Sequence, residues 1–159
     1  MRIALALAAL ALPCAAIAQD GAAPEQPAHD LAWHNRQQLA VAELKPEDGW
    51  YVLPGGLKYR RISGDGSGPR PTVSDTVTVH YAGRLLDGTQ FDSSYDRGEP
   101  ATFPLGRLVK AWQLAIPQMA VGDTIELYAP ADLAYGPLGK GPIPGNATLV
   151  FKVELLGIE

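Results

Sequence analysis

The 159-residue sequence predicts an α+β fold in which a mainly antiparallel sheet packs against one short helix. Three stretches, 75–82, 123–129 and 148–156, alternate apolar and polar residues as half-buried strands do. The stretch 108–116 instead has apolar residues at helical spacing, with Trp112 in its middle. Because no helix intervenes between most strands, the pairing is expected to be antiparallel, and the lone helix must lie across the sheet.

The first 18 residues have the three parts of a secretory signal peptide. Arg2 provides the positive charge, 3–12 is an apolar run, and Ala-Ile-Ala at 16–18 is a small-x-small cleavage site. The apolar run is too short to span a bilayer, so cleavage before Gln19 is expected. The sequence therefore predicts a mature protein that is periplasmic or secreted.

Cys14 is the only cysteine and would be removed with the signal peptide. A lipoprotein would use Cys14 as its lipid acceptor, but Pro13 before it fits that chemistry poorly. The mature chain is thus expected to have no disulfide and no thiolate chemistry. Without Arg2 it carries 12 Lys and Arg against 17 Asp and Glu. With no basic run and no second long apolar segment, neither nucleic acid nor a membrane span is expected.

The rest of the chain divides at residue 48. Residues 19–29 are small, polar and proline-bearing, which is typical of a disordered linker. Residues 30–45 are compatible with a helix that Asp30 caps and Pro46 ends. That helix either docks on the main domain or meets a partner. Eleven of the twelve aromatic residues lie in 49–159, so a single domain with the hydrophobic core is expected there.

Within 49–159 the elements follow from local patterns. In the strand 75–82, Val77, Val79 and Tyr81 share one face. The pair Asp87-Gly88 predicts a two-residue hairpin turn. The other expected elements are strands at 57–62, 89–92 and 101–104, loops at 64–71, 93–100 and 135–146, and the helix and late strands given above.

Several familiar chemistries are disfavoured. The glycines of 64–68 resemble a phosphate-binding loop, but a strand and not a helix follows them. Ser93 lacks the nucleophile elbow of a hydrolase. The histidines at 29, 34 and 80 lack metal-ligand spacing, so no metal site is expected. Asn146 begins a glycosylation motif, for which a turn before a strand is the better interpretation.

What remains is a set of mostly apolar residues, and most of them are compatible with an ordinary hydrophobic core. Two residues of the set, Tyr135 and Asp92, are less compatible with burial in a core. Tyr135 opens a Gly/Pro-rich loop, which is a poor position for burial. Asp92 follows Phe91, and a carboxylate there needs a partner if it is buried. Arg97, five residues on, is the candidate partner.

These residues lie in motifs that occur together in one family. The motifs are V-H-Y-A-G at 79–83, L-D-G-T-Q-F-D-S-S at 86–94, A-Y-G at 134–136 and A-T-L-V-F-K-V-E-L-L at 147–156, with the Trp112 helix between the second and third. In this order they resemble the FKBP-type peptidyl-prolyl cis-trans isomerases. The run G-E-P-A-T-F at 98–103 is most similar to the exported bacterial branch that includes the macrophage infectivity potentiator proteins.

The resemblance implies a five- to six-stranded antiparallel sheet curled round one short helix. It implies a rotamase that acts on proline-containing polypeptides, assists the folding of exported proteins, binds macrolides of the rapamycin type, and needs no metal or cofactor. Trp112 would form the pocket floor, Asp92 and Tyr135 would hydrogen-bond the ligand, and the Val109 N–H would hold a carbonyl. The implied catalytic residues are Asp92, Tyr135, Phe91 and Trp112; the implied substrate-binding residues are Tyr81, Arg97, Phe103, Leu108, Val109, Ile143 and Phe151.

The sequence also departs from the small cytosolic members. Ala101 replaces an aromatic residue, 106–112 is two residues shorter, the loop after Tyr135 is one shorter, and Lys140 lies near the usual loop histidine. These departures affect pocket width, the preference for the residue before proline, and macrolide affinity. Since only 30–45 corresponds to the dimerising helical region of the potentiator proteins, a monomer is expected. The alternative function is a non-catalytic peptide-binding module or chaperone that uses the same groove.

Overall fold

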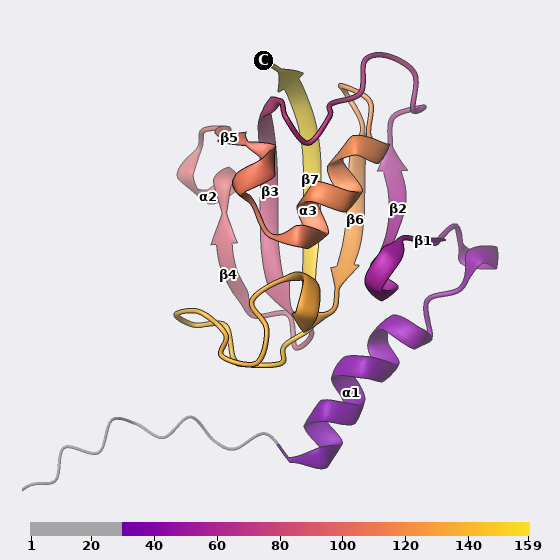
Figure 1. The fold of residues 1–159 in the computed structure, drawn as a ribbon, viewed down its shortest axis with the longest axis vertical. Helices are drawn as coiled ribbons and strands as arrows, with labels where there is room; N and C mark the ends of the chain where they lie inside the picture. Colours follow the sequence, from indigo (N-terminus) through magenta and orange to yellow (C-terminus); the bar gives the residue numbers. More distant parts are fainter. Residues whose placement is uncertain (1–29) are drawn as a thin grey trace, which may run out of the picture.

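The computed structural model describes residues 30–159, so the predicted signal peptide and linker lie outside the described residues. Figure 1 shows the arrangement of the elements. The helices are α1 (Leu31–Ala42), α2 (Ser94–Arg97) and α3 (Lys110–Ala115). The strands are β1 (Tyr51–Val52), β2 (Lys58–Ser63), β3 (Thr76–Leu85), β4 (Gln90–Ser93), β5 (Ala101–Pro104), β6 (Thr124–Ala129) and β7 (Leu149–Ile158). Five 3-10 turns join them: η1 (Pro46–Asp48), η2 (Pro54–Gly56), η3 (Leu105–Arg107), η4 (Ile116–Gln118) and η5 (Ala131–Leu133).

The strands form one seven-stranded sheet in the order β1-β2-β6-β7-β3-β4, and β5 also pairs with β3. Every pairing in it is antiparallel, as predicted. The predicted five to six strands become seven because the two-residue β1 is added at one edge. One edge of β3 pairs with β5 over Thr76–Val79 and with β4 over Ala82–Arg84. The segment between β4 and β5, which carries α2, therefore leaves the sheet at the middle of this edge.

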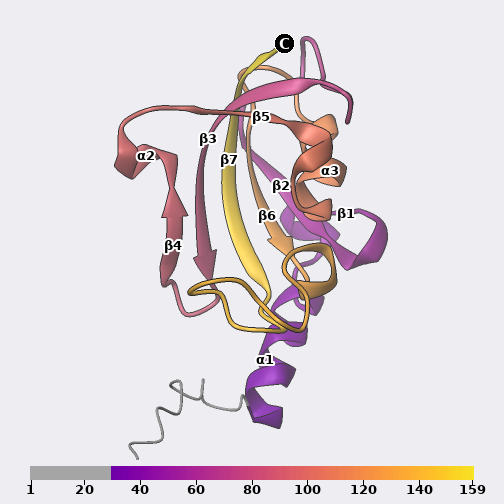
Figure 2. The same cartoon turned by 60° about the vertical axis from the view of Figure 1, so that its left-hand side comes forward.

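Helix α3 covers one face of the curved sheet (Figure 2). Ala111, Trp112 and Ala115 of this helix are buried, and they pack on the inward-facing residues of β3, β6 and β7. The alternation predicted for the strands is confirmed: Val77 and Val79 are fully buried, whereas Thr76, Thr78 and His80 are partly exposed. This packing of one helix on the strand faces supplies the core.

The helix is shorter at its start than the apolar spacing predicted. Leu108 and Val109 are extended, and the Val109 carbonyl accepts the first hydrogen bonds of the helix, from the N–H groups of Trp112 (3.0 Å) and Gln113 (3.3 Å). At the other end Pro117 cannot donate a hydrogen bond, and the chain tightens into η4. Leu108 and Val109 are thereby only half-buried, which leaves their side chains available to a pocket.

The predicted turn at Asp87-Gly88 is present, but its loop has three residues and not two. The Leu85 N–H donates to the Thr89 carbonyl (2.9 Å) and the Gly88 N–H donates to the Leu85 carbonyl (3.0 Å). Gly88 has a φ of 89°, which is typical of a type I turn followed by a glycine bulge. The Asp87 carboxylate accepts a hydrogen bond from the Thr89 N–H and favours this geometry.

The prediction of a loop at 93–100 is wrong, because this stretch contains α2. The Ser93 hydroxyl caps the helix by accepting a hydrogen bond from the Asp96 N–H, and Gly98 ends it with a φ of 75°. The Ser94 side chain is fully buried. A single turn with both caps is stable here because Ser94 also anchors it to β3, as described below.

The predicted N-terminal helix is present as α1 and docks on the domain. The Asp30 side chain caps it, accepting from the Trp33 N–H at 2.7 Å. Gln37 is buried and makes two hydrogen bonds with Thr148: its side-chain oxygen accepts from the Thr148 N–H (2.8 Å), and its carbonyl accepts from the Thr148 hydroxyl (2.9 Å). Figure 1 shows α1 beside the end of the sheet where β7 begins.

Replacing Gln37 by alanine is expected to lower the free energy of unfolding by about 1–3 kcal/mol, because the buried Thr148 N–H loses its acceptor. Urea denaturation measures this change. Gln38→Ala is the matched control, since Gln38 is exposed on the same helix and should change stability by less than about 0.5 kcal/mol. Equal unfolding midpoints for the two variants would show that α1 is not held in this way.

Candidate functional site

A pocket of 210 Å³ brings together nine side chains from across the domain. They come from β3, β4, β5, the approach to α3, α3 itself, the segment after η5, and β7. The lining residues are Tyr81, Phe91, Asp92, Phe103, Leu108, Val109, Trp112, Tyr135 and Phe151. All nine belong to the eleven residues that the sequence resemblance implied. The residues of the pocket are therefore distant in sequence and converge only on folding.

Trp112 is 4% exposed and forms the base of the pocket. Three aromatic rings contact it nearly at right angles: Tyr81 at a centroid distance of 5.2 Å, Phe151 at 5.5 Å and Phe103 at 6.3 Å. Edge-to-face contacts of this kind are favourable because the positive ring edge meets the negative ring face. They fix the indole plane, so the pocket has a rigid apolar floor.

A β-bulge directs Phe91 into the pocket. Gly83 pairs with Asp92 and Arg84 with Gln90, which leaves Phe91 as the extra residue of β4. Its ring contacts Phe151 edge-to-face at 5.8 Å. A Cβ at Gly83 would lie 2.6 Å from the Phe91 ring and 2.9 Å from the Phe151 ring. Glycine at position 83 is thus required for both rings to reach the pocket. Gly83 is the last residue of the motif V-H-Y-A-G.

Asp92 is held by two neighbours at the edge of the pocket. The Tyr81 hydroxyl donates to Asp92 Oδ2 at 2.5 Å and accepts from Arg97 Nη2 at 3.0 Å. Arg97 Nη1 also forms an ion pair with Asp92 Oδ1, as the sequence predicted. Partial burial alone would raise the pKa of Asp92, but the hydrogen bonds from Tyr81 and Arg97 and the charge of Arg97 outweigh it and lower that pKa. Asp92 is therefore an ionised, oriented carboxylate.

Tyr135 forms another wall of the pocket and is half-buried. Burial raises the pKa of its hydroxyl, and the nearby charge of Asp92 raises it further. The phenol is therefore neutral and can donate a hydrogen bond. The lining residues include no serine, threonine, cysteine, lysine or histidine. The pocket therefore offers apolar contact, one carboxylate and hydrogen-bond donors.

The other two predicted residues lie outside the lining. Arg97 contacts the pocket residues Asp92 and Tyr81, and its guanidinium carbon lies 5.5 Å from the Tyr81 ring centroid. Ile143 is 6% exposed and belongs to the hydrophobic core cluster. It supports the loop that follows Tyr135, where its backbone exchanges two hydrogen bonds with Lys140.

Sequence reasoning missed Ser94 as a positioning residue. Its hydroxyl accepts from the Tyr81 N–H at 2.8 Å and donates to the Tyr81 carbonyl at 3.3 Å. His80 Nδ1 lies 2.9 Å from the same oxygen. This contact fastens the start of α2 to β3 and so places Arg97 near Tyr81 and Asp92. The local sequence pattern that could have indicated this helix is Ser93-x-x-Asp96, which is typical of a capped helix start.

Two larger grooves, of 490 and 330 Å³, lie along α1, and a third groove, of 260 Å³, is lined by residues of β2, β3, β6 and β7. Their linings are mainly amide, charged and aliphatic residues with at most one aromatic ring each, whereas the aromatic pocket combines six rings with an ionised carboxylate. Residues 30–159 contain no cluster of histidine, cysteine or acidic residues that could hold a metal ion. Within the same residues, no helix has the length and hydrophobicity needed to cross a membrane. The aromatic pocket is accordingly the candidate site.

Comparison with known proteins decides the family. The family model described as FKBP-type peptidyl-prolyl cis-trans isomerase matches residues 68–156. This chain belongs to that family. The FKBP-type match includes every residue that lines the pocket, and it confirms the resemblance inferred from the motifs.

Three similar proteins place the chain more closely among FKBP-type isomerases. The isomerase FkpA of Aeromonas hydrophila is 52% identical over 123 residues, covering 77% of this chain and 45% of that protein. The outer membrane protein MIP of Legionella longbeachae is 47% identical over 122 residues, covering 76% and 51%. The crystal structure of FkpA from Escherichia coli has a TM-score of 0.74 at 39% identity, covering 79% and 58%. The chain spans about half the length of both sequence relatives.

Proposed function

We propose that this protein is a peptidyl-prolyl cis-trans isomerase whose active site is the aromatic pocket. The observation that carries the proposal is the convergence of six aromatic side chains and the ionised Asp92 on a space of 210 Å³. A proline ring is compact and apolar, and it fits a cavity whose floor is an indole and whose walls are phenyl rings. Family membership and the names of the relatives support the same activity.

The reaction needs neither a nucleophile nor a cofactor. Rotation about an X-Pro bond has a barrier of ~18–20 kcal/mol because amide resonance is lost in the twisted state. The rings at Trp112, Phe91 and Phe151 hold the proline and keep water from the preceding carbonyl, which lowers the cost of that loss. Asp92 and Tyr135 both line the pocket, and their polar groups are proposed to favour the twisted amide over the planar one. The Val109 N–H, just before α3, is the proposed donor to a substrate carbonyl.

The remaining residues of the implied set are proposed to bind substrate. Tyr81, Phe103, Leu108 and Phe151 supply the pocket walls, and Arg97 orients Asp92. Ile143 would contribute through the loop that it anchors. Macrolides of the rapamycin type are proposed ligands of the same pocket, because they are large apolar rings with carbonyl groups.

The proposed setting is the folding of exported proteins. The predicted signal peptide at 1–18 supports export, as does the relative named an outer membrane protein. Residues 49–159 form the proposed isomerase domain and residues 19–48 its N-terminal extension, of which α1 docks on the domain. The proposed state is a monomer, which light scattering of the mature protein would test.

The second candidate function is a peptide-binding module without catalysis, because the same pocket would hold a proline segment in either case. A protease-coupled isomerisation assay on X-Pro peptides distinguishes the two. Catalysis by the mature protein that rapamycin blocks supports the isomerase. A folded protein that binds the peptides but leaves their isomerisation rate unchanged supports the binding module.

A further inference from the structure

Lys140 places a positive charge against a wall of the pocket. Its ammonium nitrogen lies 5.7 Å from the centroid of the Tyr135 ring, and Tyr135 lines the pocket. The backbone of Lys140 is fixed by two hydrogen bonds of 2.9 Å with Ile143, whose side chain is 6% exposed. The lysine is therefore held at this wall by the fold of the loop.

No carboxylate of the described residues pairs with Lys140. Among the ion pairs of residues 30–159, none includes Lys140. The one carboxylate that lines the pocket, Asp92, is already paired with Arg97. Lys140 thus brings a positive charge without a carboxylate partner to one wall of the pocket, although the whole sequence has a net charge of −4.

We propose that Lys140 determines substrate specificity and makes the pocket prefer proline segments with an acidic residue next to the proline. The inference rests on the proposed function of the pocket. Consecutive Cα atoms are about 3.8 Å apart, so a residue adjacent to a bound proline lies beside the pocket wall. A lysine has a long flexible stem, and its ammonium group can leave the face of the Tyr135 ring to meet a carboxylate. The histidine that the family resemblance places near this position would be mostly neutral at pH 7.5, because its ordinary pKa is about 6.5.

The test compares glutamate with glutamine, which has nearly the same shape and no charge. Exchange NMR measures kcat/KM for Ala-Glu-Pro-Phe and Ala-Gln-Pro-Phe, and for the pair Ala-Pro-Glu-Phe and Ala-Pro-Gln-Phe. The wild type should prefer glutamate by about two- to fivefold at one of the two positions, the range expected for an exposed ion pair. Lys140→Gln should bring the ratio to about one, Lys140→Glu should invert it, and Lys140→Arg should retain it.

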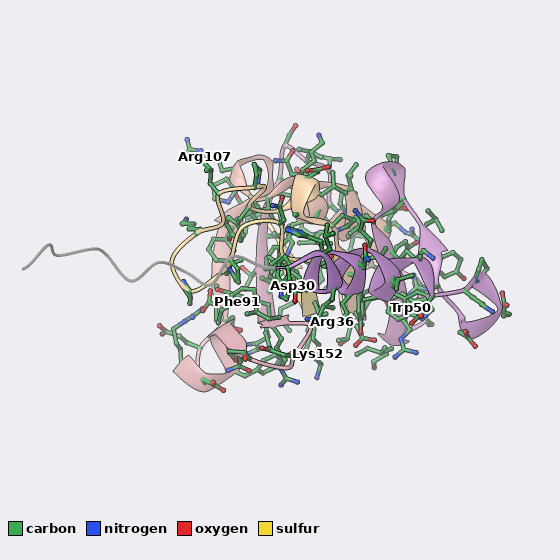
Figure 3. All side chains as sticks on the ribbon, turned by 90° about the horizontal axis from the view of Figure 1, so that it is seen from below. Asp30, Arg36, Trp50, Phe91, Arg107 and Lys152 are labelled. Atoms are coloured by element: carbon green, nitrogen blue, oxygen red, sulfur yellow. The ribbon has the colours of Figure 1, made fainter. Side chains whose placement is uncertain are left out.

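Lys152 provides a matched control. Its ammonium nitrogen lies 5.3 Å from the centroid of the Tyr95 ring, a contact of the same kind as that of Lys140. Lys152 does not line the aromatic pocket, and Figure 3 shows it at the edge of the view opposite Arg107. Lys152→Gln removes the same charge and should leave the glutamate preference unchanged. Raising the ionic strength from 0.01 to 0.15 M should reduce the wild-type preference, because it shortens the screening length from about 30 to 8 Å.

An equal glutamate-to-glutamine ratio in the wild type and in Lys140→Gln, at both positions, would overturn the inference while leaving the isomerase intact. A wild type that accelerates none of the four peptides would contradict the proposed function instead. Chemical-shift titration in the same samples then gives the dissociation constants. In that case a glutamate preference in binding that depends on Lys140 would support the inference, and its absence would overturn it.

Discussion

Replacing Trp112 by alanine is expected to lower the free energy of unfolding by about 3–5 kcal/mol, the range for removing a large buried aromatic side chain. Trp112 is 4% exposed and contacts the rings of Tyr81, Phe103 and Phe151. The substitution would leave a cavity beneath the pocket and remove three edge-to-face contacts at once. Urea denaturation followed by circular dichroism measures the loss, because it does not depend on the tryptophan signal.

Trp112→Phe separates the packing of the ring from the indole N–H. Within the described residues, Trp112 Nε1 is buried without a hydrogen-bond acceptor. A phenyl ring removes that unsatisfied donor while it retains most of the apolar contact, so the cost should be less than half that of alanine. If both substitutions cost the same, the three ring contacts do not carry the stability of the pocket floor.

Replacing Asp92 by asparagine is expected to reduce kcat/KM on X-Pro peptides by about 10- to 100-fold. Hydrogen bonds to a charged group contribute about 1.5–3 kcal/mol, and each 1.4 kcal/mol corresponds to a factor of ten. The amide keeps the shape of the side chain, but it removes the charge that Tyr81 and Arg97 orient. Steady-state kinetics on the folded variant measure the change.

Asp96→Asn is the control for a general loss of negative charge, since Asp96 is exposed in α2 and does not line the pocket. It should leave kcat/KM within about twofold of the wild type.

The lowered pKa of Asp92 predicts the acid limb of the pH profile of kcat/KM. Because the pKa of Asp92 is lowered, its carboxylate persists as pH falls through the ordinary range of aspartate, and activity that depends on it should decline only below that range. A decline centred within or above the ordinary range of aspartate, or equal losses of kcat/KM in Asp92→Asn and Asp96→Asn, would contradict the role of Asp92.

The strands were predictable because period-two alternation is a local signal that burial enforces. Val77, Val79 and Tyr81 face the core as that alternation indicates. The pairing of Arg97 with Asp92 was also predictable, because the two residues are five apart and a carboxylate beside an apolar residue such as Phe91 needs a partner if it is even partly buried. The set of pocket residues came from the family motifs and not from periodicity, which could not distinguish Trp112 in a pocket floor from Trp112 in a core.

Other features depended on contacts that leave no local pattern. Gln37 and Thr148 are 111 residues apart, and nothing near either one indicates that they meet. Helix α2 was missed because its polar residues resemble a loop, and its stability comes from the buried contact of Ser94 with Tyr81. The late start of α3 followed from the extended backbone at Leu108 and Val109, whereas apolar spacing marks only which face is buried.

We propose that the aromatic pocket catalyses rotation about X-Pro bonds. Two-dimensional exchange NMR on Ala-Leu-Pro-Phe, with the mature protein at a few per cent of the peptide concentration, tests it without a coupling protease. We expect cis-trans exchange peaks within a second, where the free peptide needs tens of seconds or more, and we expect their loss when rapamycin is added. Exchange no faster than that of the free peptide, in a sample where the resonances of Trp112 and Tyr135 shift on binding, would contradict catalysis and leave a binding site.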